Sequence, residues 1–295
     1  MIIFPNIGKR GRLGNQLFQI AALKALALKN NCDAYLSDDI DTVCDDGQFC
    51  LLNCFKHNTQ LINREYSYSL VNNVYEQNYS LMHTGIFDKE YHNVKPYTAV
   101  EGQFESEQYF KEYKKEIKES LELRDDIDDT AAAYINEIKD MYSNKPIVAI
   151  HLRRGDVIYD LHYNTDTKYE SNMLKFINYC KETYFSNTDC VFLIFSGGAQ
   201  DNSNTDDINW CRQNLPEWKN IHFCEGKNDI TDFAIFTKCS HAILTSNSTF
   251  GWWGSYLIKN EGKRIYVPRS SIGCWKNPDF FWSEEFIQVT MPTSD

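Results

Sequence analysis

The sequence contains a stretch, PIVAIHLRRGD, in which a short apolar run of strand type ends in four side chains that can do chemistry: His151, Arg153, Arg154 and Asp156. Side chains alternate along a strand, so His151 and Arg153 share one face while Leu152 and Arg154 share the other. An arginine keeps its charge and is costly to bury unpaired. The arginines therefore either pair with Asp156 or another acid, or bind an anion at the carboxyl end of a strand.

A second stretch, AILTSNSTFGWWGSYL, predicts a strand that ends in small polar residues and passes directly into a helix. The turn holds Ser246, Asn247, Ser248 and Thr249, which are good helix caps. The free backbone N–H groups and the dipole of a helix N-terminus also make such a turn an anion site. Turn chemistry alone leaves both interpretations open, and Trp252 in the same helix either packs or lines a cleft.

A third stretch, GRLGNQ, contains Arg12, Gly14, Asn15 and Gln16 in a glycine-bearing loop after a short apolar strand. It is neither a P-loop nor a dinucleotide-binding glycine motif. A glycine-rich first turn is common in α/β proteins, so this stretch by itself indicates no ligand.

The elements around these stretches alternate between strand and helix. Strands are expected at 2–4, 147–152, 190–196, 221–226, 241–248 and 264–268, and helices at 17–30, 105–123, 128–142, 170–185, 208–215, 230–240 and 249–259. Strands that recur between helices favour a parallel sheet covered on both faces. A boundary at SNKP predicts two lobes, residues 1–143 and residues 144–295, whereas residues 32–100 carry too little periodicity to assign.

Composition limits the possible functions. The chain has 295 residues, 42% of them hydrophobic and 24% charged, which is typical of a globular protein of two domains. A net charge of −11 argues against general nucleic-acid binding, so an anionic ligand needs a local group of positive charges. The sequence shows neither a leader pattern nor an apolar run approaching the ~20 residues of a membrane span, so we expect a cytoplasmic protein without a transmembrane segment.

The sequence offers little sign of a metal site. Ten cysteines are scattered without a C-x-x-C pair, and the group Cys50, Cys54 and His57 lacks a fourth ligand. Two D-x-D matches, Asp39 to Asp41 and Asp126 to Asp128, are expected by chance in so acidic a chain. We therefore expect no metal and no bound cofactor.

Taken together and in order, GRLGNQLFQIA, HLRRGD and SNSTFGWWG resemble the α-1,2-fucosyltransferases of glycosyltransferase family 11. The resemblance spans nearly the whole chain. The sequence is similar to bacterial or viral members of the family, which have no membrane anchor. It implies an α/β fold of the GT-B type, with two Rossmann-like lobes facing across a cleft. It also implies an inverting, metal-independent transfer of L-fucose from GDP-fucose to the 2-hydroxyl of a terminal galactose in an oligosaccharide.

The resemblance also implies roles for the residues. Donor contacts fall on His151, Arg153, Asp232, Ser246, Asn247, Ser248, Thr249, Arg12, Gly14 and Asn15; acceptor or cleft contacts fall on Gln16 and Trp252; and catalysis falls on Arg153, Arg154 and Asp156. The histidine and Asp232 would hold guanine, while the arginines and the serine-rich turn would neutralise the departing diphosphate in place of a metal. Asp156 is either the general base for the acceptor hydroxyl or a group that orients an arginine.

The sequence departs from the family pattern at two places. Val157 stands where an aromatic residue often follows the motif's aspartate. The middle motif F-S-D-D-x-x-W is interrupted by an insertion at 197–209, which removes the acid directly after Ser196. Either departure can alter donor or acceptor contacts.

Two other functions remain open from the sequence. One is a catalytically silent sugar- or nucleotide-binding protein of the same fold, and the other is a metal-dependent glycosyltransferase that uses a D-x-D pair. The acceptor glycan, the need for a general base, the oligomeric state and the source organism are not readable from the residues.

Overall fold

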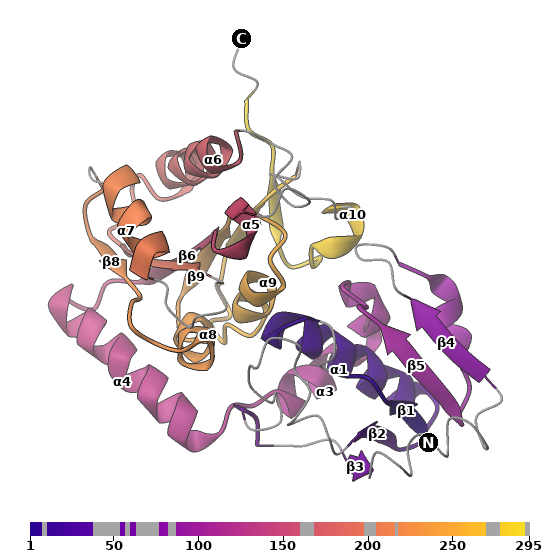
Figure 1. Cartoon of the computed structure of the whole chain (residues 1–295). Coiled ribbons are helices and arrows are strands. Elements are labelled where there is room, and N and C mark those ends of the chain that lie inside the picture. Colours follow the sequence, from indigo (N-terminus) through magenta and orange to yellow (C-terminus); the bar gives the residue numbers. More distant parts are fainter. Residues whose placement is uncertain are drawn as a thin grey trace. The chain divides into compact units, whose positions relative to one another are not determined.

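The computed structural model describes residues 1–7, 11–37, 54–56, 60–62, 77–81, 87–159, 168–197, 205–215, 218–269 and 278–292 (Figure 1). Contacts divide the chain into unit 1, Met1–Asp125 with Asp279–Phe281, and unit 2, Asp126–Pro278 with Trp282–Asp295. The predicted lobes, 1–143 and 144–295, assign acceptor and donor sides to the chain, and that functional division stays a prediction.

Unit 1 is built on a five-stranded parallel sheet with the strand order β3-β2-β1-β5-β4. Its elements are β1 (Ile2–Phe4), α1 (Leu13–Lys29), β2 (Ala34–Ser37), β3 (Gln60–Ile62), β4 (Gln77–Leu81), the 3₁₀ helix η3 (Lys89–Asn93), β5 (Thr98–Gly102), the 3₁₀ helices η4 (Glu107–Tyr109) and η5 (Lys111–Tyr113), and α3 (Lys114–Ser120). The strand order reverses between β1 and β5, and such switch points are where open α/β sheets bind ligands.

The continuous helix predicted at 105–123 is wrong. The segment instead forms two 3₁₀ turns and the short helix α3, because Phe110 has an extended φ of −139° that interrupts the helix. The interruption lets Tyr109 and Phe110 both be buried, with Tyr109 edge-on to Tyr91 and Phe104 and Phe110 against Phe18. Aromatic burial therefore overrides the local helix propensity.

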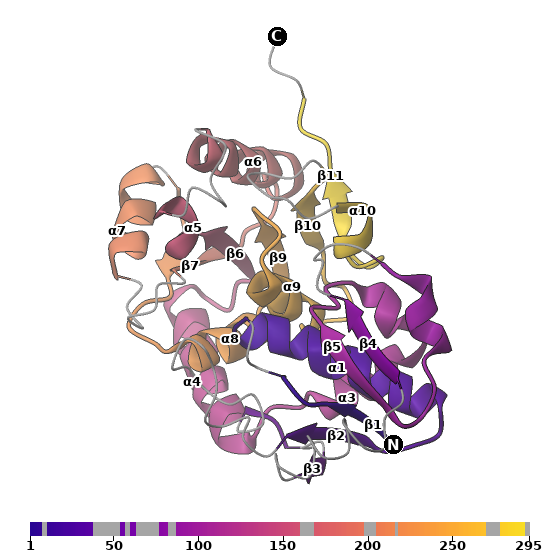
Figure 2. The same ribbon diagram turned by 45° about the vertical axis from the view of Figure 1, so that its right-hand side comes forward.

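Unit 2 is a doubly wound α/β fold with a six-stranded parallel sheet (Figure 2). Its elements are α4 (Asp125–Met141), β6 (Ile147–Arg153), α5 (Asp156–Tyr159), α6 (Tyr169–Tyr184), β7 (Val191–Gly197), α7 (Thr205–Asn214), β8 (Ile221–Phe223), α8 (Asp229–Thr237), β9 (His241–Leu244), α9 (Thr249–Tyr256), β10 (Ile265–Pro268) and β11 (Ile287–Val289). The short helix α10 (Pro278–Phe281) belongs to unit 1 except for its first residue. The order β8-β7-β6-β9-β10-β11 is the 3-2-1-4-5-6 arrangement of a Rossmann fold. The two parallel sheets confirm the predicted α/β class.

The central strand β6 presents opposite faces to different helices, as its alternation predicts. Leu152 lies on the face that packs against α6, within a cluster that includes Met173 and Phe176. His151 lies on the other face, with its ring 6.5 Å from Phe236 of α8 and 5.6 Å from Phe250 of α9. Alternate residues of β6 therefore contact the helices on opposite faces of the sheet.

Two glycines let helix α9 lie close to its neighbours. A Cβ atom added at Gly254 would lie 2.8 Å from the ring of Phe236, and one added at Gly251 would lie 3.0 Å from the ring of His151. Gly251 and Gly254 are three residues apart on the helix, so they share the face that contacts α8 and β6. The two glycines of the GWWG sequence thus permit a close approach that no other residue type allows.

The described cysteines all carry free thiols, and all except Cys32 are buried. This agrees with their expected use as small apolar residues. Of the group Cys50, Cys54 and His57, only Cys54 lies within the described residues. In the described part of the chain, no helix combines the length and the apolar character needed to cross a membrane.

We expect Gly254→Ala to lower the free energy of unfolding by about 1–2 kcal/mol, because the new methyl group overpacks against a buried aromatic ring. Gly262→Ala is the matched control, since a Cβ there meets only an atom of Asn260 at 3.7 Å. The control should stay within about 0.5 kcal/mol of the parent in urea unfolding. Equal stability of the two variants would contradict the close approach of α9.

Candidate functional site

The switch point of unit 2 lies between β6 and β9, and it brings two of the three sequence motifs together. Strand β6 ends in HLRRGD and β9 leads into SNSTF, and the register pairs His151 with Leu244. The link continues past the ladder, because the Thr245 hydroxyl and the Thr245 backbone N–H both donate to the His151 carbonyl, at 2.9 and 3.3 Å. Both motifs therefore emerge at the carboxyl ends of neighbouring strands, the usual ligand position in this fold.

His151 is a neutral imidazole in an aromatic surrounding. The residue is 5% exposed, and its ring faces Phe236 and Phe250. Burial, together with the positive charge of Arg153, lowers the pKa of His151 to about 3. Its Nδ1 atom has no hydrogen-bond partner among the described residues. A neutral ring with an available nitrogen is suited to hydrogen bonding with an uncharged ligand group.

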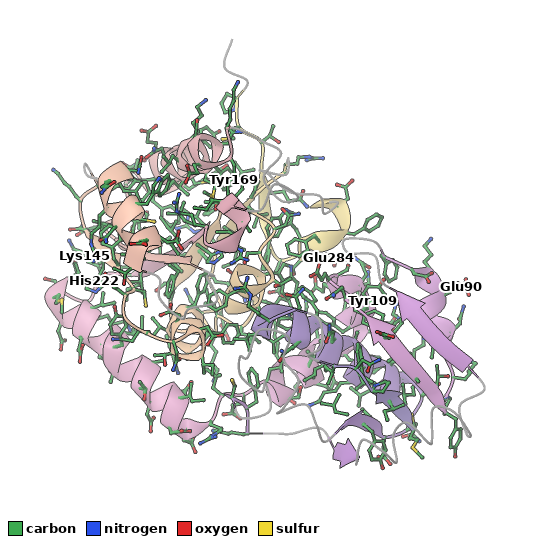
Figure 3. The ribbon with its side chains drawn as sticks, in the orientation of Figure 1. Glu90, Tyr109, Lys145, Tyr169, His222 and Glu284 are labelled. Carbon is green, nitrogen blue, oxygen red and sulfur yellow. The ribbon has the colours of Figure 1, made fainter. Side chains whose placement is uncertain are left out.

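Arg153 shares the face of His151 and is partly exposed. Its Nη1 atom donates to the carbonyl of Gly197 at 3.3 Å, across from the end of β7. Its backbone carbonyl accepts a hydrogen bond of 2.7 Å from the hydroxyl of Tyr169, the first residue of α6 (Figure 3). The backbone is thus held while the guanidinium keeps access to the ligand edge of the sheet.

Arg154 lies on the opposite face of β6, in a different environment from Arg153. It is 6% exposed, forms ion pairs with Asp207, at 3.0 Å, and with Glu170, and stacks on Trp210 at 3.9 Å from the ring centroid. A guanidinium held by two carboxylates and an aromatic ring has its charge compensated within the protein. The ion pair that the sequence raised as an alternative for this residue is present, and the predicted catalytic role of Arg154 stays a prediction.

Asp207 supplies the acid that the interrupted middle motif lacks. Its carboxylate accepts from Arg154 and also from the backbone N–H of Gly155 at 3.3 Å. Gly155 has a φ of +61°, so the turn after β6 needs both a glycine and this acceptor. The D-D-x-x-W half of the motif survives as DDINW in α7, which was the sequence signal for this residue; residues 198–204 of the insertion lie outside the described residues.

The serine-rich turn forms the N-terminus of α9. Ser248 is the N-cap residue, and its side chain makes no capping hydrogen bond. Ser246, Asn247 and Thr249 are buried, and among the described residues the Ser246 hydroxyl has no hydrogen-bond partner. The hydroxyls of Ser246 and Ser248 are thus not used as caps, which favours the anion-site interpretation of this turn. Asp156 is the first residue of α5, and its side chain lies outside what the structure describes.

Asp232 lies in the first turn of α8, one helical turn before Phe236, the residue that contacts His151. Residues four apart share a helix face, so the carboxylate lies on the side of α8 that faces the switch point. Burial raises the pKa of Asp232 to about 7, while a hydrogen bond of 3.1 Å from the thiol of Cys224 acts in the other direction. No pattern in the sequence pointed to the contribution of Cys224.

In unit 1, the GRLGNQ residues lie at the switch point between β1 and β5. Arg12 is the N-cap residue of α1, Gly14 is buried in its first turn, and Asn15 donates to Glu105 at 2.6 Å and to Gln103 at 3.4 Å. Glu105 is 2% exposed and lies in the segment that follows β5, three residues after Gly102. The segments after β1 and β5 thus both carry polar groups. Sequence analysis missed Glu105 because it placed this residue in a predicted helix at 105–123.

Gln16 and Trp252 are buried, at 1% and 0% exposure. Gln16 donates to the carbonyl of Gly11, and Trp252 stacks on Tyr256 with ring centroids 4.6 Å apart. Both side chains therefore pack in the interior, and their predicted role toward an acceptor stays a prediction.

Within the described ranges, no group of three or more His, Cys, Asp or Glu side chains is arranged to hold a metal ion. The pair Asp126 and Asp128 lies on α4, and Asp128 forms an ion pair with Lys238 at 2.5 Å. The other D-x-D match, Asp39 to Asp41, lies outside the described residues.

Comparisons with known proteins agree with this geometry. A profile described as Glycosyl transferase family 11 matches residues 4–276. The galactoside alpha-(1,2)-fucosyltransferase 2 of Oryctolagus cuniculus is 24% identical over 301 residues, covering 96% of this chain and 76% of the relative. The alpha-1,2-colitosyltransferase of Escherichia coli is 27% identical over 172 residues, covering 53% of this chain and 50% of the relative.

Among solved structures, POFUT1 in complex with GDP is similar with a TM-score of 0.51 and 14% identity, covering 90% of this chain and 97% of that chain. At this identity the likeness concerns the fold alone. The similarity and the two Rossmann-like units confirm the predicted GT-B type.

We expect Asp207→Asn to lower the free energy of unfolding by about 3 kcal/mol, because it removes one partner from a buried ion pair and leaves the charge of Arg154 undercompensated. Asp206→Asn, a change at the exposed neighbouring residue, is the control and should be nearly neutral. Urea unfolding of both variants measures the difference. A neutral Asp207→Asn would mean that Arg154 is not held by this carboxylate.

Acid should destabilise the fold through His151. The unfolded chain takes up the proton near pH 6.5, whereas the folded protein keeps the ring neutral down to about pH 3. The unfolded state therefore binds more protons between these values, and stability falls as the pH falls. Between pH 7 and pH 5 this single group should remove about 2 kcal/mol.

The measurement compares the pH dependence of urea unfolding in the parent and in His151→Gln. Only the slopes are compared, since the substitution also changes packing. The variant should lose this part of the pH dependence, and parallel curves would contradict a buried, neutral His151.

Proposed function

The chain belongs to glycosyltransferase family 11, and from that premise we propose that it transfers L-fucose from GDP-β-L-fucose to the 2-hydroxyl of a terminal galactose. The transfer inverts the anomeric carbon and needs no metal ion. One observation carries the proposal: Arg153 and the N-terminus of α9 lie at the carboxyl ends of the two strands that flank the switch point of unit 2. Positive groups at this position suit a nucleoside diphosphate.

The relatives support this donor and this linkage. A matched protein is named an alpha-(1,2)-fucosyltransferase of galactosides, and the similar solved structure holds GDP. The identities are low, so the exact acceptor of this chain is a matter for experiment rather than for the names of its relatives.

The chemistry of the step follows from where charge develops. As the bond between fucose and GDP breaks, negative charge grows on the leaving diphosphate and positive charge on the sugar. In our proposal, Arg153 donates to the diphosphate while the dipole at the N-terminus of α9 stabilises the same charge. Arg154 contributes indirectly, because its pairing with Asp207 fixes the turn that follows Arg153.

The guanine is assigned to His151 and Asp232. Both lie on the side of the sheet covered by α8 and α9, and Phe236 lies in the same helix as Asp232 and against the ring of His151. An ionised carboxylate accepts from the two adjacent N–H groups of guanine, and a neutral imidazole can donate to or accept from the base. The pairing would select guanine over adenine.

The acceptor is assigned to unit 1, whose switch point carries Asn15, Gln103 and Glu105. Asp156, at the start of α5, remains the first candidate for the base that takes the proton of the galactose hydroxyl. If the sugar develops positive charge early, a weak base is sufficient.

Two alternatives make different predictions. A catalytically silent binding protein would bind GDP without transfer. The similarity to a colitosyltransferase makes colitose the second donor sugar to test, with the same linkage and the same nucleotide site.

The test is transfer from GDP-fucose to lactose in excess EDTA, with the linkage of the product read by NMR. We expect an α-1,2 product from the parent and a rate lower by ~10²–10³-fold in Arg153→Ala. Arg212→Ala is the matched control, because Arg212 is a surface arginine of the same unit that pairs with Glu225. It should leave the rate unchanged.

Each failure identifies a different part of the proposal. Activity that returns only with added divalent metal would rule out the metal-independent mechanism. Transfer from the colitose donor but not from GDP-fucose would change the sugar, while GDP binding without any transfer would favour the silent protein. No binding of GDP at all would remove the assigned nucleotide site.

A further inference from the structure

Three side chains from different elements of unit 2 form a directed chain of hydrogen bonds that ends at Asp232. The hydroxyl of Tyr134, on α4, donates to the sulfur of Cys224, which follows β8. The thiol of Cys224 in turn donates to Oδ1 of Asp232 at 3.1 Å. Each donor supports the next, because a thiol that accepts a hydrogen bond is held in one rotamer, with its proton aimed at the carboxylate.

The backbone fixes the positions of all three groups. The N–H of Cys224 donates to the carbonyl of Ile194 at 2.9 Å, which ties it to the middle of β7. Asp232 is anchored by its own N–H, which donates to the carbonyl of Asn228 at 2.9 Å. The sulfur of Cys224 is buried, whereas Asp232 is partly exposed. The series of hydrogen bonds therefore runs from the interior of unit 2 toward the edge to which we assign the ligand.

We propose that Cys224 is a positioning residue for guanine recognition, which holds Oδ1 of Asp232 so that the carboxylate presents both oxygens to N1–H and the 2-amino group of the base, with Tyr134 orienting the thiol. This inference rests on the proposed function, because it takes GDP as the ligand at Asp232. It adds the residues that make one partly buried carboxylate selective for guanine.

The charge state of Asp232 gives the proposal a second readout. Burial raises its pKa to about 7, and the negative charge of Asp229 acts in the same direction, while the Cys224 thiol and Lys227 favour the ionised form. On α4, the Tyr134 hydroxyl bonds the thiol; burial raises the pKa of Tyr134, and the charges of Asp232 and Glu137 act in the same direction. Only the ionised carboxylate accepts two hydrogen bonds from guanine, so the affinity for GDP should fall as the pH falls through this range.

The experiment measures the dissociation constants of GDP and of inosine diphosphate, which lacks the 2-amino group, by calorimetry at pH 6, 7 and 8. Cys224→Ala should weaken GDP binding about tenfold at pH 7, reduce the preference for GDP over inosine diphosphate, and move the midpoint of the pH profile upward. Cys224→Ser keeps a donor at this position and should retain the selectivity of the parent. The diphosphate itself titrates in this range, but equally in every variant, so it cancels in the comparison.

Cys239→Ala is the matched control. Cys239 is another buried cysteine of unit 2, and its thiol contacts the carbonyl of Ile235 rather than Asp232. This variant loses the same atoms from the interior and should keep the affinity, selectivity and pH midpoint of the parent. A merely structural effect of removing a thiol would alter both alanine variants alike, and that result would overturn the proposal.

The remaining outcomes separate the inference from the function on which it rests. If the parent binds GDP and Cys224→Ala has the same selectivity and midpoint, Cys224 has no positioning role and the donor assignment stands. If Cys224→Ala does not fold, Tyr134→Phe decides: a raised midpoint supports the chain of donors, and the midpoint of the parent overturns it. If neither the parent nor any variant binds GDP, the proposed function itself fails.

Discussion

The pairing of β6 with β9 is the interaction on which the rest of the site depends. The two strands are separated by almost ninety residues of sequence, yet they are neighbours in the sheet and are joined further by Thr245 and the His151 carbonyl. Because the strand order reverses here, the following chain segments leave toward opposite faces of the sheet. The arginine of one motif and the helix N-terminus of the other therefore lie at the carboxyl ends of neighbouring strands.

The alternation of side chains along β6 separates the two arginines into different environments. Arg154 points toward α6 and α7, where two carboxylates and Trp210 compensate its charge. Arg153 points toward the side of His151 and remains partly exposed. A chain with a net charge of −11 can therefore place a partly exposed arginine at a strand end while it buries the neighbouring arginine between two carboxylates.

The aromatic surrounding of His151 sets its protonation state, and packing of the helices sets that surrounding. Gly251 and Gly254 allow α9 to approach, which brings Phe250 toward the imidazole and excludes water from it. A charged imidazole beside Arg153 would repel it, whereas the neutral ring does not. Asp232, one turn away from Phe236, is less buried and keeps a pKa of about 7. His151 therefore stays neutral near pH 7, whereas the carboxyl group of Asp232 changes its protonation state in that range.

The sequence by itself determined the α/β class, the parallel strands of unit 2, the separation of the two arginines by strand parity and the two motifs that meet at the switch point. These features follow from local periodicity and turn chemistry, which every segment carries without reference to the rest of the chain. Only the tertiary structure decided which distant groups meet: Asp207 with Arg154, Glu105 with Asn15, and Cys224 with Asp232. It also decided that Gln16 and Trp252 are buried and that the helix at 105–123 is interrupted. The physical reason is that burial and pairing depend on the partners which folding brings together, and a local pattern does not specify them.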